Sequence, residues 1–189
     1  MAMTAVGRMA FGNLIEAKPD NFGNTRWGCG LILSDAEVAP LQKFEQLAIE
    51  RRKEFDKKFV AQSSPIVPSE KKNEDGTKEA VPGEWLVRFS RKLERKAKDG
   101  TLYRQDPPQL WDSLGRLVNG KIKEVPWGSM VAVRFEYYAY NRGSMGVNFD
   151  LVGAQISELA VTEDAPPPIE GGWVVEDDMD PSAELLANA

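Results

Sequence analysis

The sequence predicts a mainly β domain with one inserted helix, a long loop and an acidic C-terminal tail. Three features carry this prediction: short runs of alternating apolar residues bounded by turn-forming residues, one stretch with helical apolar spacing, and a last segment without basic residues. The chain has 189 residues, 42% of them apolar, which suffices for the core of one domain. We therefore expect one folded domain over 1–160 and a flexible tail over 161–189.

Two strands are expected near the N-terminus, over 6–15 and 25–33. The run 18–24 between them is rich in turn-forming residues. One face of the second strand is apolar: Trp27, Cys29, Leu31 and Leu33. Because side chains of a strand alternate between its two faces, we expect this face to lie on the core.

One helix is expected from Pro40 to about residue 59, where apolar residues recur at helical spacing. Just before it, Ser34 and Glu37 have the spacing of a capping box. Proline is disfavoured inside a helix but suits its first position, so we expect a short turn first and a helix that begins at Pro40. The second half of this helix is basic and is expected to face solvent or DNA.

The segment of about 62–84 is expected to be a long mobile loop. It combines prolines with a charged run and offers few residues for a core. From Trp85 the residues alternate as in a strand, but the Lys/Arg run beyond Arg91 is also compatible with the start of a helix. Short strands are expected at 101–104 and about 109–112.

The clearest strand covers 130–140 and is expected to form a hairpin with a strand over 147–156. Glycine-rich turn residues lie between the two strands. One face of the first strand is apolar and is expected in the core: Val131, Val133, Phe135, Tyr137 and Ala139. The opposite face carries Arg134, Tyr138 and Tyr140, which we expect on the surface.

The composition excludes several classes of enzyme. The chain has no histidine and one cysteine, so His/Cys zinc sites, Ser-His-Asp triads and an internal disulfide are ruled out. Two acid-x-Lys triplets, at 70–72 and 94–96, match a spacing of metal-dependent nucleases, but such triplets arise by chance in a chain that is 28% charged. We expect no catalytic residue, no metal site and no cofactor. No stretch approaches the roughly 20 apolar residues of a membrane span, and a soluble, cytoplasmic protein is expected.

The charge is distributed unevenly along the chain. Residues 161–189 hold eight acidic residues and no Lys or Arg, so 1–160 have a net charge of +3 within the total of −5. Within them, 85–142 hold twelve basic and six acidic residues. The tail is either a solubilising end or a segment that competes with a polyanion for the basic surface.

Aromatic residues interleaved with positive charge are typical of surfaces that bind single-stranded nucleic acid. Bases stack on exposed rings, while Lys and Arg follow the phosphates. The candidate contacts are Arg8, Arg26, Trp27, Arg88, Lys92, Tyr103, Trp111, Arg134, Tyr138, Tyr140 and Arg142. Trp27 lies on an apolar strand face, where packing in the core is the favoured alternative.

Four segments resemble a known family: 7–11 (Gly-Arg-Met-Ala-Phe), 27–33 (Trp-Gly-Cys-Gly-Leu-Ile-Leu), 111–113 (Trp-Asp-Ser) and 133–149. Over about 4–160 the chain is similar to the phage-encoded single-stranded-DNA-binding proteins built on an OB-fold. The resemblance implies a five-stranded Greek-key barrel with insertions and no catalysis. It also implies sequence-independent binding of single-stranded DNA in phage replication and recombination, in the host cytoplasm.

The same family resemblance implies that the acidic tail contacts replication partners. The candidate contacts in the tail are Trp173, Asp177, Asp178, Asp180 and Glu184. Many proteins of this functional class end in an aromatic residue, whereas here Trp173 is the only aromatic of the tail. Two alternatives stay open, a structural or adaptor protein and a binder of single-stranded RNA. The sequence also leaves both a monomer and a dimer open.

Overall fold

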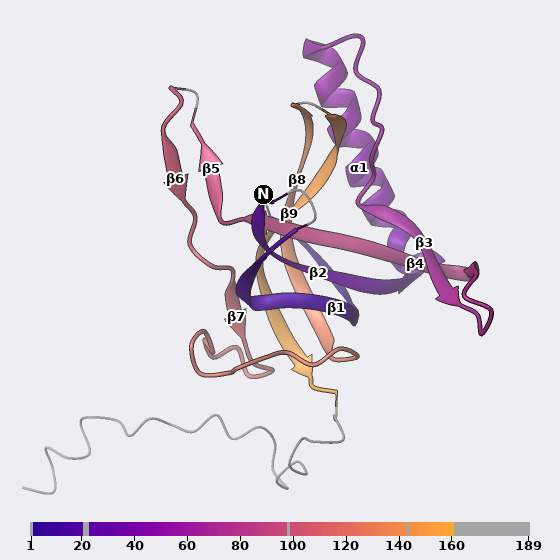
Figure 1. Ribbon diagram of the computed structural model, residues 1–189, viewed down its shortest axis with the longest axis vertical. Helices are drawn as coiled ribbons and strands as arrows, with labels where there is room; N and C mark the ends of the chain where they lie inside the picture. Colours follow the sequence, from indigo (N-terminus) through magenta and orange to yellow (C-terminus); the bar gives the residue numbers. More distant parts are fainter. Residues whose placement is uncertain (1, 21–22, 98, 143, 161–189) are drawn as a thin grey trace, which may run out of the picture.

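The computed structural model describes residues 2–20, 23–97, 99–142 and 144–160 (Figure 1). Within these residues the chain is mainly β, as predicted, with nine strands and one helix. The predicted tail, 161–189, lies outside the described residues. The elements are, in chain order, β1 (Met3–Pro19), β2 (Thr25–Ser34), α1 (Asp35–Phe55), β3 (Ile66–Lys72), β4 (Lys78–Lys92), β5 (Glu94–Lys96), β6 (Leu102–Arg104), β7 (Gln109–Trp111), β8 (Met130–Arg142) and β9 (Ser144–Glu158).

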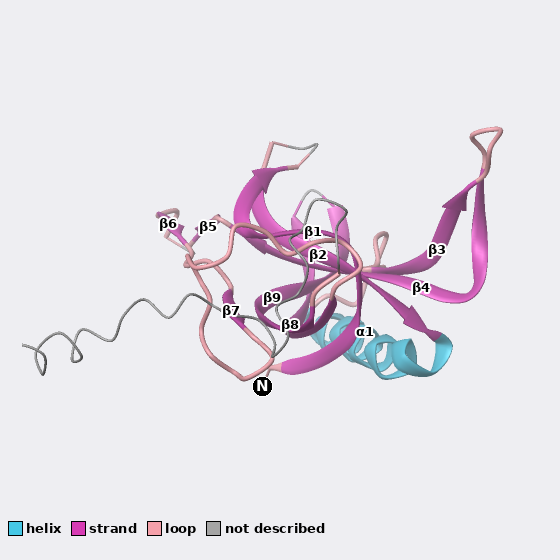
Figure 2. Cartoon of the chain, turned by 90° about the horizontal axis from the view of Figure 1, so that it is seen from below, coloured by secondary structure: helices cyan, strands magenta, loops and turns pink. Residues whose placement is uncertain are grey.

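Five strands are linked in a ring by their pairing. β1 pairs with β2 and with β8, β2 pairs with β4, and β8 pairs with β9, all antiparallel. β4 and β9 then meet in parallel at one residue pair, Ser90 and Asp150. β3 and β7 extend the sheet beside β4 and β9 (Figure 2). This arrangement belongs to the OB-like class that the sequence resemblance implied.

The interior of the ring is aromatic and apolar. The side-chain rings of Phe89, Phe135 and Phe149 come from three different strands, with centroid separations of 5.1, 4.9 and 5.8 Å. Phe44 of α1 stacks on Tyr137 with a centroid separation of 5.2 Å, so the helix packs against β8. The predicted apolar face of β2 is confirmed, because all four of its residues are buried.

The helix begins and ends earlier than the sequence analysis predicts. It starts at Asp35 rather than Pro40, because the Glu37 carboxylate accepts hydrogen bonds from the Ser34 N–H at 2.8 Å and the Ser34 hydroxyl at 2.7 Å. Pro40 is tolerated in the second turn, on an exposed face where water can reach the carbonyl that it leaves free. The helix ends at Phe55, and Phe59 instead lies buried beyond it.

The expected loop over about 62–84 is wrong in its secondary structure, since β3 and the first part of β4 form a hairpin there. Asn73 and Thr77 close its turn, where the Asn73 N–H donates to the Thr77 carbonyl at 2.8 Å and Gly76 has a φ of +85°. β3 is an edge strand, which tolerates its proline. A two-stranded ribbon can form from charged residues without a core of its own, so the lack of apolar residues did not predict a loop here.

The basic run beyond Arg91 forms strands and not a helix. β4 continues to Lys92, and β5 then pairs with β6 in a second hairpin. The Ala97 N–H donates to the Thr101 carbonyl at 2.8 Å across a turn in which Gly100 has a φ of +93°. The β5–β6 and β3–β4 hairpins project on opposite sides of the ring (Figures 1 and 2).

Candidate nucleic-acid interface

Three neighbouring strands present a polar outer surface, which we call the β4–β8–β9 face. It consists of Ser90 of β4, Tyr138 and Tyr140 of β8, and Asn148 and Asp150 of β9. The residues that alternate with them on β8 and β9 point into the core, which directs these side chains outward. Asn148 is the cross-strand partner of Tyr138, so the aromatic and polar groups lie side by side.

Asp150 holds two arginines at this face. Its side chain is only 7% exposed, and it forms ion pairs with Arg95 of β5 and, with an Nη1–Oδ2 distance of 4.0 Å, with Arg91 of β4. Burial raises the pKa of Asp150, and the two arginines only partly oppose that effect. The Arg95 guanidinium also lies over the Tyr138 ring, 5.8 Å from its centroid. Arg95 therefore fastens the β5–β6 hairpin to β8 and β9.

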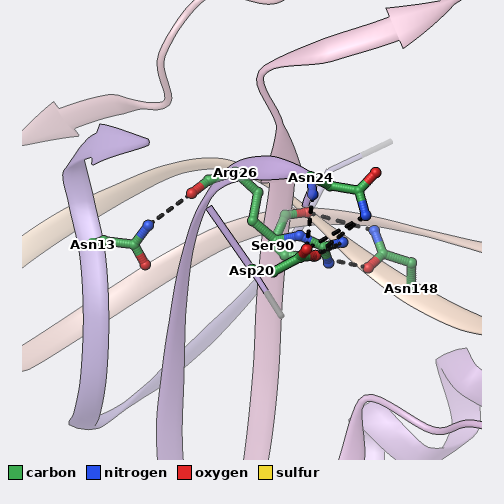
Figure 3. Close-up of polar contacts among 6 residues, drawn as sticks. All are labelled: Asn13, Asp20, Asn24, Arg26, Ser90 and Asn148. Atoms are coloured by element: carbon green, nitrogen blue, oxygen red, sulfur yellow. Dashed lines mark hydrogen bonds and ion pairs between the residues drawn. The ribbon is translucent and has the colours of Figure 1, made fainter. Parts of the chain in front are cut away.

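Hydrogen bonds fix the side chains between Tyr138 and β4. Asn148 Nδ2 donates to the Tyr138 hydroxyl at 3.3 Å. The Ser90 hydroxyl donates to Asn148 Oδ1 at 3.1 Å (Figure 3). Burial raises the pKa of Tyr138 above its ordinary value. The side chain remains 39% exposed, so part of a well-positioned ring is open to a ligand.

The outer end of the β8–β9 hairpin is anchored to the segment that follows α1. The Tyr140 hydroxyl and Ser63 Oγ are hydrogen-bonded at 2.7 Å. The Val147 N–H donates to the Ser63 carbonyl at 3.1 Å, and Asn141 Nδ2 donates to Asp56 Oδ2 at 2.9 Å. The second tyrosine of the face is therefore held from two sides, by its own strand and by this segment.

The β1–β2 turn positions another predicted contact, Arg26. The Asp20 carboxylate accepts a hydrogen bond from the Asn24 N–H at 2.9 Å and pairs with the Arg26 guanidinium (Figure 3). Asn13 Nδ2 donates to the Arg26 carbonyl at 2.7 Å. Arg26 is the cross-strand partner of Lys92, so it borders the outer side of β4.

Several other predicted contacts lie on or beside the β4–β8–β9 face. Arg88 and Lys92 stand two residues on either side of Ser90, and Arg134 stands four residues before Tyr138, so all three share the outer side of their strands. Each of them is exposed. Tyr103, 48% exposed, lies directly opposite Arg95 in the β5–β6 pair.

The structure places three predicted contacts elsewhere. Trp27 is 5% exposed because its strand face packs on the core, so its ring is not available for stacking. Trp111 packs on Gly153, where an added Cβ would lie 2.7 Å from the indole ring. Arg8 is exposed on β1 but lies opposite Met130, eight residues, or about 26 Å of strand, from Tyr138. Arg142 ends β8, and its side chain and the tail candidates lie outside the described residues.

Sequence reasoning missed four residues of this surface: Arg91, Arg95, Asn148 and Asp150. Asn148 and Asp150 carried a usable signal, since they alternate with apolar residues on a predicted strand. The arginines carried no such signal. They reach Asp150 only because β4 and β9 meet at the Ser90–Asp150 pair, which brings segments more than 50 residues apart in the sequence into contact.

Within the described ranges there is no group of three or more His, Cys, Asp or Glu residues that could hold a metal ion. Cys29 is buried, and burial raises the pKa of its thiol to about 12. No helix in this part of the chain is long and apolar enough to span a membrane.

The fold is OB-like and resembles the folds of two phage single-stranded-DNA-binding proteins. The crystal structure of gp2.5, a single-stranded DNA binding protein encoded by bacteriophage T7, matches with a TM-score of 0.59 and 15% identity, over 87% of this chain and 97% of that one. The single-stranded DNA-binding protein from bacteriophage Enc34 in complex with ssDNA matches with a TM-score of 0.60 and 14% identity, over 86% and 89%. No protein-family model and no curated protein matches the sequence. The similarity confirms the sequence resemblance at the level of the fold.

Proposed function

We propose that this chain binds single-stranded DNA without regard to sequence, as a non-enzymatic protein of phage replication and recombination in the host cytoplasm. The observation that carries the proposal is the exposed Tyr138 ring with Arg95 over it, on the outer face of an OB-like ring of strands. An aromatic platform beside cations suits bases and phosphates together. The shared fold with the Enc34 protein in complex with ssDNA supports the same ligand.

In the proposed mechanism, bases stack on tyrosines while the phosphates follow the surrounding cations. Tyr138, Tyr140 and Tyr103 supply the rings. The cations are Arg88, Lys92, Arg91, Arg95 and Arg134, with Arg26 and Arg142 at the borders and Arg8 as a distant contact. Because every base has a flat apolar face and every nucleotide has a phosphate, such a surface accepts strands of any sequence.

A direct test measures the anisotropy of a fluorescent oligo-dT on titration with the full-length protein at several salt concentrations. We expect an affinity that falls steeply as salt rises, with a slope that reports the number of phosphate contacts. Competition with an oligo-rU of equal length decides between DNA and RNA. A folded protein with no salt-dependent binding to either strand would instead support the adaptor alternative.

The acidic tail is proposed to compete with DNA for the basic surface and to recruit replication proteins through the region of Trp173 and its acidic neighbours. Eight carboxylates on a tail beside a body of net charge +3 favour such an intramolecular contact at low ionic strength. Truncation after Ala160 should therefore tighten binding to oligo-dT, most clearly at low salt. A truncated protein that binds no better than the full chain at any salt would remove the competition model.

A further inference from the structure

A cleft of about 480 Å³ lies where the end of β1 approaches the segment that follows β6. Its apolar walls include Ile15 and Ala17 of β1, together with Leu93 and Pro107. Trp27, Arg104 and Gln105 also line it. A cleft of this size is within the range that holds small organic ligands.

Two polar atoms of residues that line this cleft are buried without a partner. Trp27 Nε1 and Gln105 Oε1 make no hydrogen bond within the described part of the chain. A buried donor or acceptor left unsatisfied costs free energy, so folded proteins rarely keep one without a reason. The two residues that carry this donor and this acceptor both line the cleft.

The cleft is connected to the β4–β8–β9 face through Arg91. Arg91 Nε donates to the Asp106 carbonyl at 3.0 Å, and Asp106 lines the cleft. The same guanidinium pairs with Asp150, which binds Arg95 over Tyr138. A bound DNA strand that follows these arginines from Tyr138 would therefore reach the cleft.

We propose that the cleft receives one nucleobase of the bound strand, and that Gln105 and the Trp27 N–H contact the edge of that base. The apolar walls suit the flat faces of a base. The carboxylates of Glu16 and Asp106 also line the cleft, and they would repel a phosphate but can accept hydrogen bonds from a base amino group. The inference rests on the proposed DNA binding, and it adds one position at which the four bases are not equivalent.

The test compares wild type with Gln105→Leu, using oligo-dT, oligo-dC and oligo-dA of equal length in the anisotropy assay. Loss of one hydrogen bond to the base is expected to weaken binding of the preferred homopolymer about 2- to 12-fold, and to bring the affinities for the three closer together. Because Gln105 Oε1 is unpaired in the free protein, the unfolding midpoint of the variant should be unchanged or higher. A purely structural Gln105 would give the opposite, a lower midpoint with unchanged ratios among the homopolymers.

Gln42→Leu is the matched control, since Gln42 is exposed on α1 and does not line the cleft. It should leave all three affinities unchanged. Trp27→Phe removes the second edge contact and also places a smaller ring in the core, so it is measured well below its own unfolding midpoint. It should shift the same ratios.

The outcomes separate the two proposals. If wild type binds no oligonucleotide, the proposed function fails. If wild type binds all three homopolymers and neither variant changes their relative affinities, DNA binding stands and the base cleft is overturned.

Discussion

Two long hairpins extend from the ring of strands, and they differ in what holds them. The β8–β9 hairpin is anchored beyond its own pairing, by Ser63 to Tyr140 and by Asp56 to Asn141. The outer part of the β3–β4 hairpin pairs only with itself, and all its residues from Glu70 to Ala80 are exposed. A two-stranded ribbon alone is marginally stable, so it holds binding groups at fixed positions only where other elements also contact it. We call β8–β9, which has such contacts, the braced hairpin, and β3–β4 the unbraced hairpin.

The largest effect should come from removing both rings of the braced hairpin. Each base stacked on an aromatic ring is worth about 1 to 3 kcal/mol, so Tyr138→Ala with Tyr140→Ala should weaken oligo-dT binding by at least about 30-fold. The measurement is the anisotropy titration, on a variant shown to be folded by circular dichroism. Tyr140→Phe keeps the ring but loses the bond to Ser63. It should bind nearly as well as wild type, because the Val147–Ser63 and Asn141–Asp56 hydrogen bonds still anchor the hairpin. Unchanged affinity in the double variant would remove the stacking role.

A glycine substitution in each hairpin sharpens the comparison. An added Cβ at Gly146 would lie 2.1 Å from Ser63 Oγ and 2.8 Å from the Ser63 carbonyl oxygen. Gly146→Ala must therefore push the segment around Ser63 away from the hairpin. Such overpacking costs about 1 to 3 kcal/mol, and binding should weaken along with stability. Gly76→Ala in the other hairpin should cost roughly 1 to 2 kcal/mol through its positive φ, with no change in binding. Chemical denaturation and anisotropy measure the two effects, and equal losses of affinity would contradict the comparison.

A smaller effect is expected from Asp150→Asn, which leaves the braced hairpin intact but frees the two arginines. Removal of this negative charge from the β4–β8–β9 face should tighten binding severalfold at low salt and steepen the salt dependence. A variant that binds more weakly would show that Asp150 is needed to position Arg95.

Stability should respond to pH through the same residue. The folded state raises the pKa of Asp150 above its unfolded value of 3.8, so the folded protein holds this proton more tightly. The contribution of Asp150 to stability is thus full below pH 3.8 and is lost as the pH rises through the folded pKa. The unfolding free energy of Asp150→Asn relative to wild type should therefore increase from acidic to neutral pH, and denaturant titrations at several pH values would show it. A difference that falls with pH would contradict the raised pKa.

The smallest effect is expected at the unbraced hairpin. Lys71 and Glu79 are exposed cross-strand partners, so Lys71→Ala with Glu79→Ala leaves the net charge unchanged. Stability should change by no more than about 0.5 kcal/mol, and affinity for oligo-dT should stay the same. A clear loss of affinity would place this hairpin in the interface.

Local patterns were sufficient for much of the fold. Alternation along β2 and β8 predicted which side chains are buried, because a half-buried strand must divide its residues between two faces. The same pattern placed Arg134, Tyr138 and Tyr140 on the outer side. It failed for the β3–β4 hairpin, which forms without apolar residues at its tip. It also failed for the helix start, where Ser34 and Glu37 form a capping box and the helix begins at Asp35, five residues before Pro40.

The sequence by itself determined the mainly β character, the inward and outward faces of the strands and the residue types of the surface, because these follow from residue type and spacing over a few positions. The OB-like class came from the family resemblance. Only the tertiary structure decided which charged and aromatic groups meet. Arg95, Tyr138 and Asp150 come together because β5 folds back over β8 and β9. Gln105 and Trp27 line one cleft because the Gln105 N–H donates to the Leu93 carbonyl, and the Leu93 N–H donates to the Thr25 carbonyl at the start of β2. Contacts between segments so distant along the chain depend on the register of the whole sheet, which no local pattern encodes.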